Sequence, residues 1–547
     1  MKKFLIYIIP ALLFTSCNKM LKEEVHSQSP LEYMKTVNGF EDGVKAAYSS
    51  LRNFYATERG MSLTVFGTDT YTMGADGSFK FVNQYTPGLD ARVSIIREIW
   101  NEFYLAINAC NMIVDIAPEV AGLAEKTKNI RVAEAKFLRA HYFFVLAQMF
   151  GPIPLPLKGN TAVTTEANRE SLDKVYPAII ADLEAALPNL EVKPTDYGRA
   201  TKAAAEHLLA KVYLTKATSV AKQATDYGNA LLYAKNVITN YTHKLLPDFA
   251  RVFEQGSGEK NDEVIWAVQY TNDVRTNSTG NNAHVFFLME YDVLPGMQRD
   301  VANGRPFKRF RPTKFTLDSI FKDRVNDARY EKSFKHVFYS NNAATIPKDA
   351  SGNPKYRVGD TCIWLPGVEL PAAEINSKPY AVYPPSKYTA KIYPSLIKFL
   401  DPLRPDRTTF EGSRDYLAFR LAETYLIAAE AAMYSGDNVA AADFINAVRW
   451  RAARVTPDAV LNAAYRTAMT ATPDMMSIDF ILDERGRELL GEQDRWFDLV
   501  RTGKLIERVT KWNTDAAANI KDFHVLRPIP QEQIDRTTNV FPQNTGY

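Results

Sequence analysis

The sequence has little cysteine and lacks the residue spacings that mark common catalytic and metal sites. Its 547 residues include three cysteines and seven scattered histidines, so no Cys/His cluster has the spacing of metal ligands. It has no Walker loop, dinucleotide fingerprint, His-Glu-x-x-His motif or Gly-x-Ser-x-Gly elbow. These absences argue against most nucleotide-dependent, metal-dependent and serine-nucleophile enzymes.

Excess charge and long hydrophobic runs are also missing. The formal net charge is +3, too small to attract nucleic acid or an acidic surface. The longest apolar run, Phe4 to Phe14, is too short to span a bilayer. Hydrophobic residues nevertheless make up 46% of the chain, enough for a large core. Aromatic residues make up 12%; most belong in that core, and a minority on loops would suit the C–H faces of sugar rings.

The first residues, MKKFLIYIIPALLFTSC, have the pattern of a bacterial lipoprotein signal. Lys2 and Lys3 precede the apolar run, and small residues lead to Cys17. Residues 1–16 are therefore predicted to be a signal peptide, Cys17 the lipid anchor and 17–30 a polar tether. A plain secretory signal with an incidental cysteine is the alternative. With the lipid, acyl chains would hold an otherwise soluble body at a membrane.

The rest of the chain is predicted to be one mainly α-helical domain, residues 31–547, with three parts. Residues 31–244 show helical spacing of apolar residues, in pairs typical of a tetratricopeptide-like scaffold. Residues 245–410 are irregular, with one predicted strand over 263–270 and short helices over 319–321 and 328–334. Residues 411–547 return to helix and end in a Pro- and Asn-rich tail. Predicted helices are 39–53, 95–116, 130–150, 171–187, 203–216, 229–239, 415–434, 438–454, 477–491 and 494–502.

The acidic residues in ILDERGRELLGEQDRW (481–496) are the natural place to look for a glycosidase pair. Arginines are interleaved with them at helical spacing, so ion pairs are expected instead of acid–base catalysis. His141 and His207 fall in helical patterns and are predicted to be structural. No enzymatic activity is expected.

The remaining two cysteines have no assigned chemistry. Cys110 lies in an apolar helical pattern and is predicted to be a core thiol. A disulfide between Cys110 and Cys362 is the alternative in an oxidising compartment, but the spacing does not indicate it.

Several phrases, in order, resemble the SusD/RagB family of outer-membrane nutrient-binding lipoproteins. They are AEAKFLRAHYFFVLAQMFGPIPL (133–155), RATKAAAEHLLAKVYL (199–214), RLAETYLIAAEAAMYSGD (420–437), FINAVRWRAA (444–453), ILDERGRELLGEQDRWFDLVRTGKL (481–505) and LRPIPQEQIDRTTNVFPQNTGY (526–547). The resemblance implies a helical, surface-exposed lipoprotein that captures glycan and delivers it to a SusC-like TonB-dependent transporter. A RagB-like peptide-binding lipoprotein is the alternative function.

The family's ligand residues do not lie in these phrases, so candidates follow from chemistry: rings for stacking, and charged groups for hydroxyls. They are taken from the loop 67–86 and the irregular middle: Asp69, Tyr71, Phe79, Tyr291, Arg299, Arg305 and Trp364. Asp69 and the nearby Asp76 are equally well explained as turn residues. The basic stretch RPFKRFRPTK (305–314) suits either loop packing or anionic sugar groups. No cofactor is expected; a loop could hold calcium, but no ligand spacing supports it.

Overall fold

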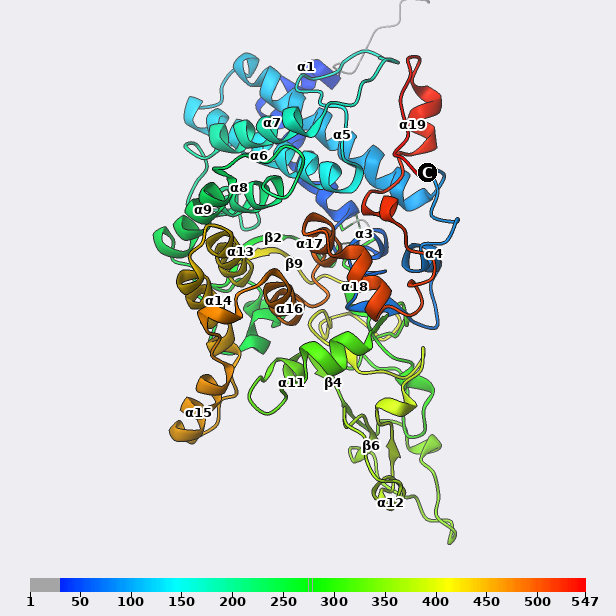
Figure 1. Cartoon of the computed structure of the whole chain (residues 1–547). Coiled ribbons are helices and arrows are strands. Elements are labelled where there is room, and N and C mark those ends of the chain that lie inside the picture. Colours follow the sequence, from blue (N-terminus) through cyan, green and yellow to red (C-terminus); the bar gives the residue numbers. More distant parts are fainter. Residues whose placement is uncertain (1–29, 274, 278) are drawn as a thin grey trace, which may run out of the picture.

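The computed structural model describes residues 30–547, apart from 274 and 278 (Figure 1). The predicted signal peptide and lipid anchor, Cys17, lie outside the described residues. Within the described part, no helix is both long enough and apolar enough to cross a membrane.

The structure confirms a mainly α-helical fold. The helices before the irregular middle are α1 (Pro30–Met34), α2 (Val37–Ser49), α3 (Glu58–Thr64), α4 (Lys80–Gln84), α5 (Ser94–Ile116), α6 (Glu125–Phe150), α7 (Leu172–Ala186), α8 (Lys202–Lys216) and α9 (Asp226–Asn240). Among its described residues the middle has the short α10 (Ala283–Phe286), α11 (Arg329–Ser333) and α12 (Ala372–Ser377). A π-helical turn, Phe315–Ile320, stands where a short helix over 319–321 was predicted. The C-terminal helices are α13 (Leu421–Tyr434), α14 (Asn438–Ala452), α15 (Ala459–Met469), α16 (Ile478–Glu488), α17 (Arg495–Arg501), α18 (Leu505–Trp512) and α19 (Gln531–Arg536).

The longest helix, α6, shows how local sequence sets these elements. Apolar residues recur along it every three or four positions, and from Phe137 to Leu146 nearly every side chain is buried. The helix ends at Gly151, whose φ of 73° favours glycine, and Pro152 prevents its continuation. Threonine caps open α2 and α8: the Thr36 hydroxyl accepts the Gly39 N–H, and the Thr201 hydroxyl accepts the Ala204 N–H.

The helices pack as one continuous stack, although the middle region separates them into two groups in the sequence. Neighbours in the stack are α5 with α6, α6 with α7, α8 with α9, and α13 with α14. The joint is α9 against α13, which brings together segments about 180 residues apart in the chain (Figure 1). Helices on both sides of the middle region therefore belong to one scaffold.

Short strands form small sheets in the middle region and in the segments that pair with it. The strands are β1 (Tyr71–Met73), β2 (Val264–Val268), β3 (Phe310–Pro312), β4 (Phe334–Lys335), β5 (Val337–Tyr339), β6 (Thr361–Trp364), β7 (Ala381–Val382), β8 (Ser395–Leu396) and β9 (Tyr416–Arg420). Antiparallel pairs are β1 with β3, β2 with β9, and β4 with β8, while β5, β6 and β7 form a separate sheet. The sheet β5–β6–β7 and helix α15 both project from the body (Figure 1).

One predicted helix begins later than expected, and several helices were not predicted. The helix expected from Asp415 begins only at Leu421, because Tyr416–Arg420 pairs with β2 as strand β9. That pairing joins the start and the end of the middle region, a long-range contact that helical periodicity does not reveal. Helices α15 and α18 were not predicted.

Candidate functional site

The acidic residues of α16 lie in a buried ion-pair network, as expected. The Glu488 carboxylate is fully buried and contacts the guanidinium groups of Arg329 at 3.0 Å, Arg420 at 2.7 Å, and Arg451. The Glu484 carboxylate is also fully buried and contacts Arg329, Arg449 and Arg487 at 2.7–2.8 Å. Carboxylates held this way are ionised and shielded from solvent, so they cannot serve as an acid–base pair.

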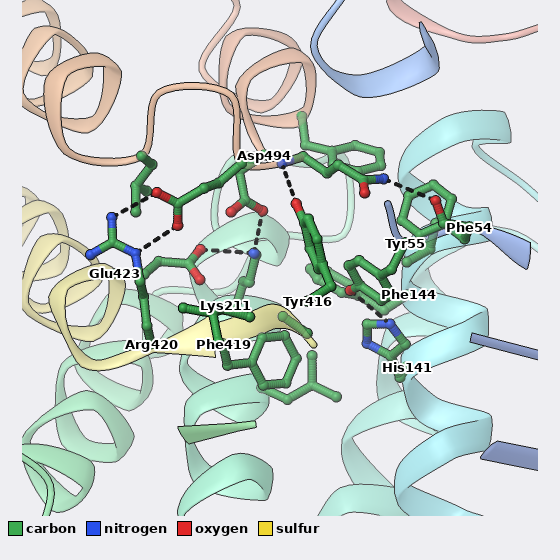
Figure 2. A pocket seen from close by; sticks show the side chains of 18 of the residues that line it. Phe54, Tyr55, His141, Phe144, Lys211, Tyr416, Phe419, Arg420, Glu423 and Asp494 are labelled. Atoms are coloured by element: carbon green, nitrogen blue, oxygen red, sulfur yellow. Dashed lines mark hydrogen bonds and ion pairs between the residues drawn. The ribbon is translucent and has the colours of Figure 1, made fainter. Parts of the chain in front are cut away.

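A second part of the network surrounds the small cavity in Figure 2. The Lys211 ammonium lies between the carboxylates of Glu423, at 2.7 Å, and Asp494, at 2.5 Å. Burial, reinforced by the nearby Glu423 charge, raises the pKa of Asp494 to about 7. The cavity has a volume of about 30 Å³, enough for a water molecule or two but not for a sugar. The cavity lies between α6, α8, α13, α17 and strand β9.

The two helical histidines are structural, as predicted. The His141 ring lies beside the cavity, and its Nε2 is 3.1 Å from the Tyr55 hydroxyl (Figure 2). Burial lowers its pKa to about 3, so the ring is neutral. His207 is fully buried and hydrogen bonded to Thr424 and Glu423. In the described part of the chain, no three His, Cys, Asp or Glu side chains are grouped to hold a metal ion.

Three of the predicted ligand residues are buried, which corrects their assumed exposure. Asp69 is fully buried, and its carboxylate accepts two hydrogen bonds from the Arg495 guanidinium, at 2.6 and 2.7 Å. Tyr71 is 1% exposed within β1. Tyr291 is 0% exposed, stacks on Phe338, and donates its hydroxyl proton to the Gly304 carbonyl. A glycan on the surface cannot reach these groups in this conformation.

Two further candidates, Arg299 and Trp364, are partly exposed. Arg299 is held by the Asp292 carboxylate at 2.8 Å. Trp364 is half-buried on β6, in the projecting sheet, with the Lys378 ammonium 5.9 Å from its ring centroid.

The Cys362 thiol is buried and unpaired, as is that of Cys110, so the two form no disulfide. Burial raises the pKa of Cys362 to about 11 and that of Cys110 to about 12.

The remaining candidates, Phe79 and Arg305, belong to a surface where half-buried rings alternate with arginines. We call this surface the aromatic–arginine patch; it consists of Phe79, Phe81, Arg305, Phe307, Arg309 and Phe410. The Arg305 guanidinium lies 5.3 Å from the Phe307 ring centroid and 5.7 Å from that of Phe410. The Arg309 guanidinium lies 5.2 Å from the Phe307 centroid. Such a surface offers apolar ring faces beside hydrogen-bond donors.

Backbone geometry holds the two halves of the patch together. Strand β1 pairs with β3, and the Gly74 N–H beyond it donates to the Arg309 carbonyl at 2.8 Å. Gly77 has a φ of 121°, and a Cβ there would lie 3.0 Å from the Arg309 side chain. The loop from Gly74 to Phe79 can therefore pass close to Arg309 only with glycine at this position. Glu58 fixes the Arg309 guanidinium from the other side at 2.9 Å.

Sequence reasoning missed part of this patch. The interleaved basic and aromatic stretch 305–314 contains Phe307 and Arg309, and this pattern was the available signal. Phe410 has no such signal, because its contact with Arg305 joins positions about 100 residues apart. In the same stretch, Lys308 and Arg311 form ion pairs with Glu290 and Asp515, which agrees with the packing role predicted for this stretch. Binding of anionic sugar groups by the stretch stays a prediction.

Comparison with known families finds two matching models. The model described as the SusD family matches residues 262–547. A second model, described as starch-binding associating with outer membrane, matches residues 24–214.

Individual relatives match over nearly the full chain. A SusD-like protein of Formosa agariphila is 23% identical, covering 97% of this chain and 96% of the relative. Another from that organism is 26% identical, covering 92% and 91%. Among solved structures, a laminarin binding SusD-like protein has a TM-score of 0.69 at 22% identity, covering 93% and 99%. Surface glycan-binding protein A from Bacteroides thetaiotaomicron, in complex with laminarihexaose, has a TM-score of 0.68 at 19% identity, covering 93% and 99%.

Proposed function

Because the chain belongs to the SusD family, we propose that it is a glycan-binding lipoprotein of the outer membrane that delivers its ligand to a SusC-like TonB-dependent transporter. Its relatives include proteins named for binding laminarin and for surface glycan binding. The family-model description associates the N-terminal half with starch and the outer membrane.

The observation that carries the proposal is the aromatic–arginine patch. Its phenyl rings are half-buried, so packing fixes their orientation while one side stays open to solvent. Arg305 and Arg309 lie against these rings and present N–H donors for sugar hydroxyls. A rigid platform of this kind binds without losing much side-chain entropy.

The test is binding of the purified chain to a panel of neutral, acidic and host-type glycans, followed by calorimetry. Replacing Phe307 and Phe410 together by alanine should weaken binding about tenfold or more, since each lost ring contact is worth ~1 kcal/mol. Tyr434→Ala is the control, because Tyr434 is 43% exposed on α13, outside both the patch and the projecting sheet. Thermal melts check that each variant is folded.

The outcomes are distinct. If a glycan binds the control variant as tightly as the wild type but binds the double variant weakly, the patch is supported as the binding site. Loss of binding in Trp364→Ala with the double variant unaffected would move the site to the projecting sheet. If the chain binds none of the glycans but does bind peptides, a peptide-uptake function would replace the proposal.

Lipid attachment is tested separately. Cys17→Ser should abolish incorporation of labelled palmitate and release the protein from the outer membrane, because a thiol is required for acylation. Surface exposure is then read from protease accessibility on intact cells, and transporter association from co-purification with the tagged lipoprotein. Unchanged membrane retention of Cys17→Ser would favour a plain secretory signal.

The proposal includes no catalytic role. The acidic residues of α16 are committed to arginine partners, as described above. Release of reducing sugar by the purified protein, abolished by one Asp or Glu substitution, would contradict this part of the proposal.

A further inference from the structure

A second open pocket lies in the helical half of the molecule, away from the aromatic–arginine patch. It has a volume of about 570 Å³, within the range of small-molecule sites. Its walls come from the end of α2, the loop 195–199 before α8, Lys260, and the end of β2. None of the patch residues lines it.

The pocket is lined by four cations and one anion: Lys45, Arg52, Arg199 and Lys260, against Asp196. Two of these cations are already neutralised. Arg199 pairs with Glu134 at 2.8 Å and with Asp196 at 2.9 Å, and Lys45 pairs with Asp42, outside the pocket, at 3.2 Å. Arg199 therefore uses the single acidic group of the lining.

The other two cations, Arg52 and Lys260, form no ion pair within 4 Å among the residues that the structure describes. The Lys260 charge acts on the carboxyl of Asp415, which does not line the pocket. The Arg52 Nε is buried and makes no hydrogen bond, while its Nη1 makes a long one, 3.4 Å, to the Gln269 carbonyl. Leaving buried donors of a charged group unsatisfied is costly, which favours an anion that would accept from them.

An aromatic ring stands beside this unpaired charge. The Lys260 ammonium lies 5.0 Å from the ring centroid of Tyr197, which lines the pocket. The Tyr197 hydroxyl donates to the Glu259 carbonyl at 3.3 Å, which fixes the ring. Gly198, with a φ of 88°, brings the loop against Gln269, where a Cβ would lie 2.8 Å from the Gln269 side chain. The ring, the ammonium and the guanidinium are therefore held around one opening.

We propose that this pocket is a second saccharide site, selective for a sugar that carries a carboxylate or a sulfate, with the anionic group on Arg52 and Lys260 and the sugar ring at Tyr197. This inference rests on the proposed glycan-binding function. It adds a second site, in a pocket separate from the patch, that selects for charged sugars. Uronates and sulfated sugars both carry an anionic group that the two cations can bind. The experiment tests one ligand of each kind to tell them apart.

The test measures binding of three size-matched oligosaccharides, one neutral, one uronate and one sulfated, together with inorganic sulfate, by calorimetry at low salt. Arg52→Gln with Lys260→Gln should weaken binding of the acidic ligand about tenfold or more, because both charged donors to its anionic group are lost. The neutral ligand should be unaffected. Tyr197→Ala should weaken the acidic oligosaccharide but leave inorganic sulfate unchanged.

The matched control is Lys126→Gln with Lys322→Gln, which removes two exposed charges elsewhere and should change nothing. Lys260→Gln alone covers the case in which the Arg52 variant does not fold, since Lys260 is exposed. Equal binding of acidic ligand by the pocket variant and wild type would overturn the proposal. The proposal would also be overturned if inorganic sulfate binds but neither the uronate nor the sulfated oligosaccharide does. Loss of neutral-glycan binding in Phe307→Ala/Phe410→Ala tests the proposed function independently.

Discussion

Removal of the Glu488 charge is the perturbation for which the structure predicts the largest effect. Its carboxylate is 0% exposed and lies against three guanidinium groups, those of Arg329, Arg420 and Arg451. Glu488→Gln keeps the shape of the side chain but removes the negative charge. The three arginines then keep four acids, Glu263, Asp327, Glu484 and Glu492, and one buried positive charge loses its compensating negative charge.

The magnitude follows from the pKa of Glu488. Burial alone would raise it, but Arg451, Arg420 and Arg329 outweigh burial and lower it from 4.5 to about 2. A difference of this size corresponds to roughly 3 kcal/mol of stability at neutral pH. Breaking a buried pair by removing one partner costs about 3–5 kcal/mol, in agreement. We therefore expect Glu488→Gln to lower the free energy of unfolding by roughly 3 kcal/mol.

The assay is urea unfolding at pH 7, followed by tryptophan fluorescence, with Asp483→Asn as the control on the same helix. The Asp483 side chain is 36% exposed and pairs with Arg508 at 2.8 Å. Water and salt screen such a pair, so its loss should cost less than about 1 kcal/mol.

The pH dependence provides a second check. Because the folded pKa of Glu488 is lowered, its contribution is complete above pH 4.5 and is lost as the pH falls toward 2. The gap between wild type and Glu488→Gln should therefore narrow below pH 4.5. If Glu488→Gln and Asp483→Asn are equally stable, or the gap does not change with pH, the network does not stabilise the fold as argued.

Other groups give further predictions. Burial raises the pKa of Asp415, which accepts the Tyr270 N–H, to about 7. Between pH 4 and 7 the folded state then holds a proton that the unfolded state has lost, so stability falls with rising pH, by up to about 1.4 kcal/mol per pH unit. Asp415→Asn should flatten this slope in melts across that range; an unchanged slope would assign it to another group. Cys110 and Cys362 should resist a thiol reagent in the folded protein and both react in urea, and a native disulfide would block this reaction.

Much of the helical frame was predictable because its cause is local. The spacing of apolar residues predicted α5 to α9 to within a few residues, since one buried face is enough to define a helix. The interleaved Arg and Glu of α16 correctly predicted ion pairs. Strand β9 was missed because its partner β2 lies about 150 residues earlier.

The candidate site was predicted only in part, because exposure is a property of the packed molecule. Tyr71, Tyr291 and Phe79 are alike in sequence terms, aromatic residues in irregular segments. Packing buries the two tyrosines and leaves Phe79 half-exposed. Nothing in the sequence distinguishes them, since burial depends on which distant segments cover each ring.

The sequence by itself determined the helical class, the family resemblance and the absence of known catalytic motifs, because periodicity and motif spacing are written along the chain. The tertiary structure decided which charges are neutralised and which rings face solvent. Glu488 meets Arg329 across 159 residues, and Arg305 meets Phe410 across about 100. Such contacts depend on how the helices stack, so only the folded arrangement distinguishes a structural acid from a free one and a core ring from a binding surface.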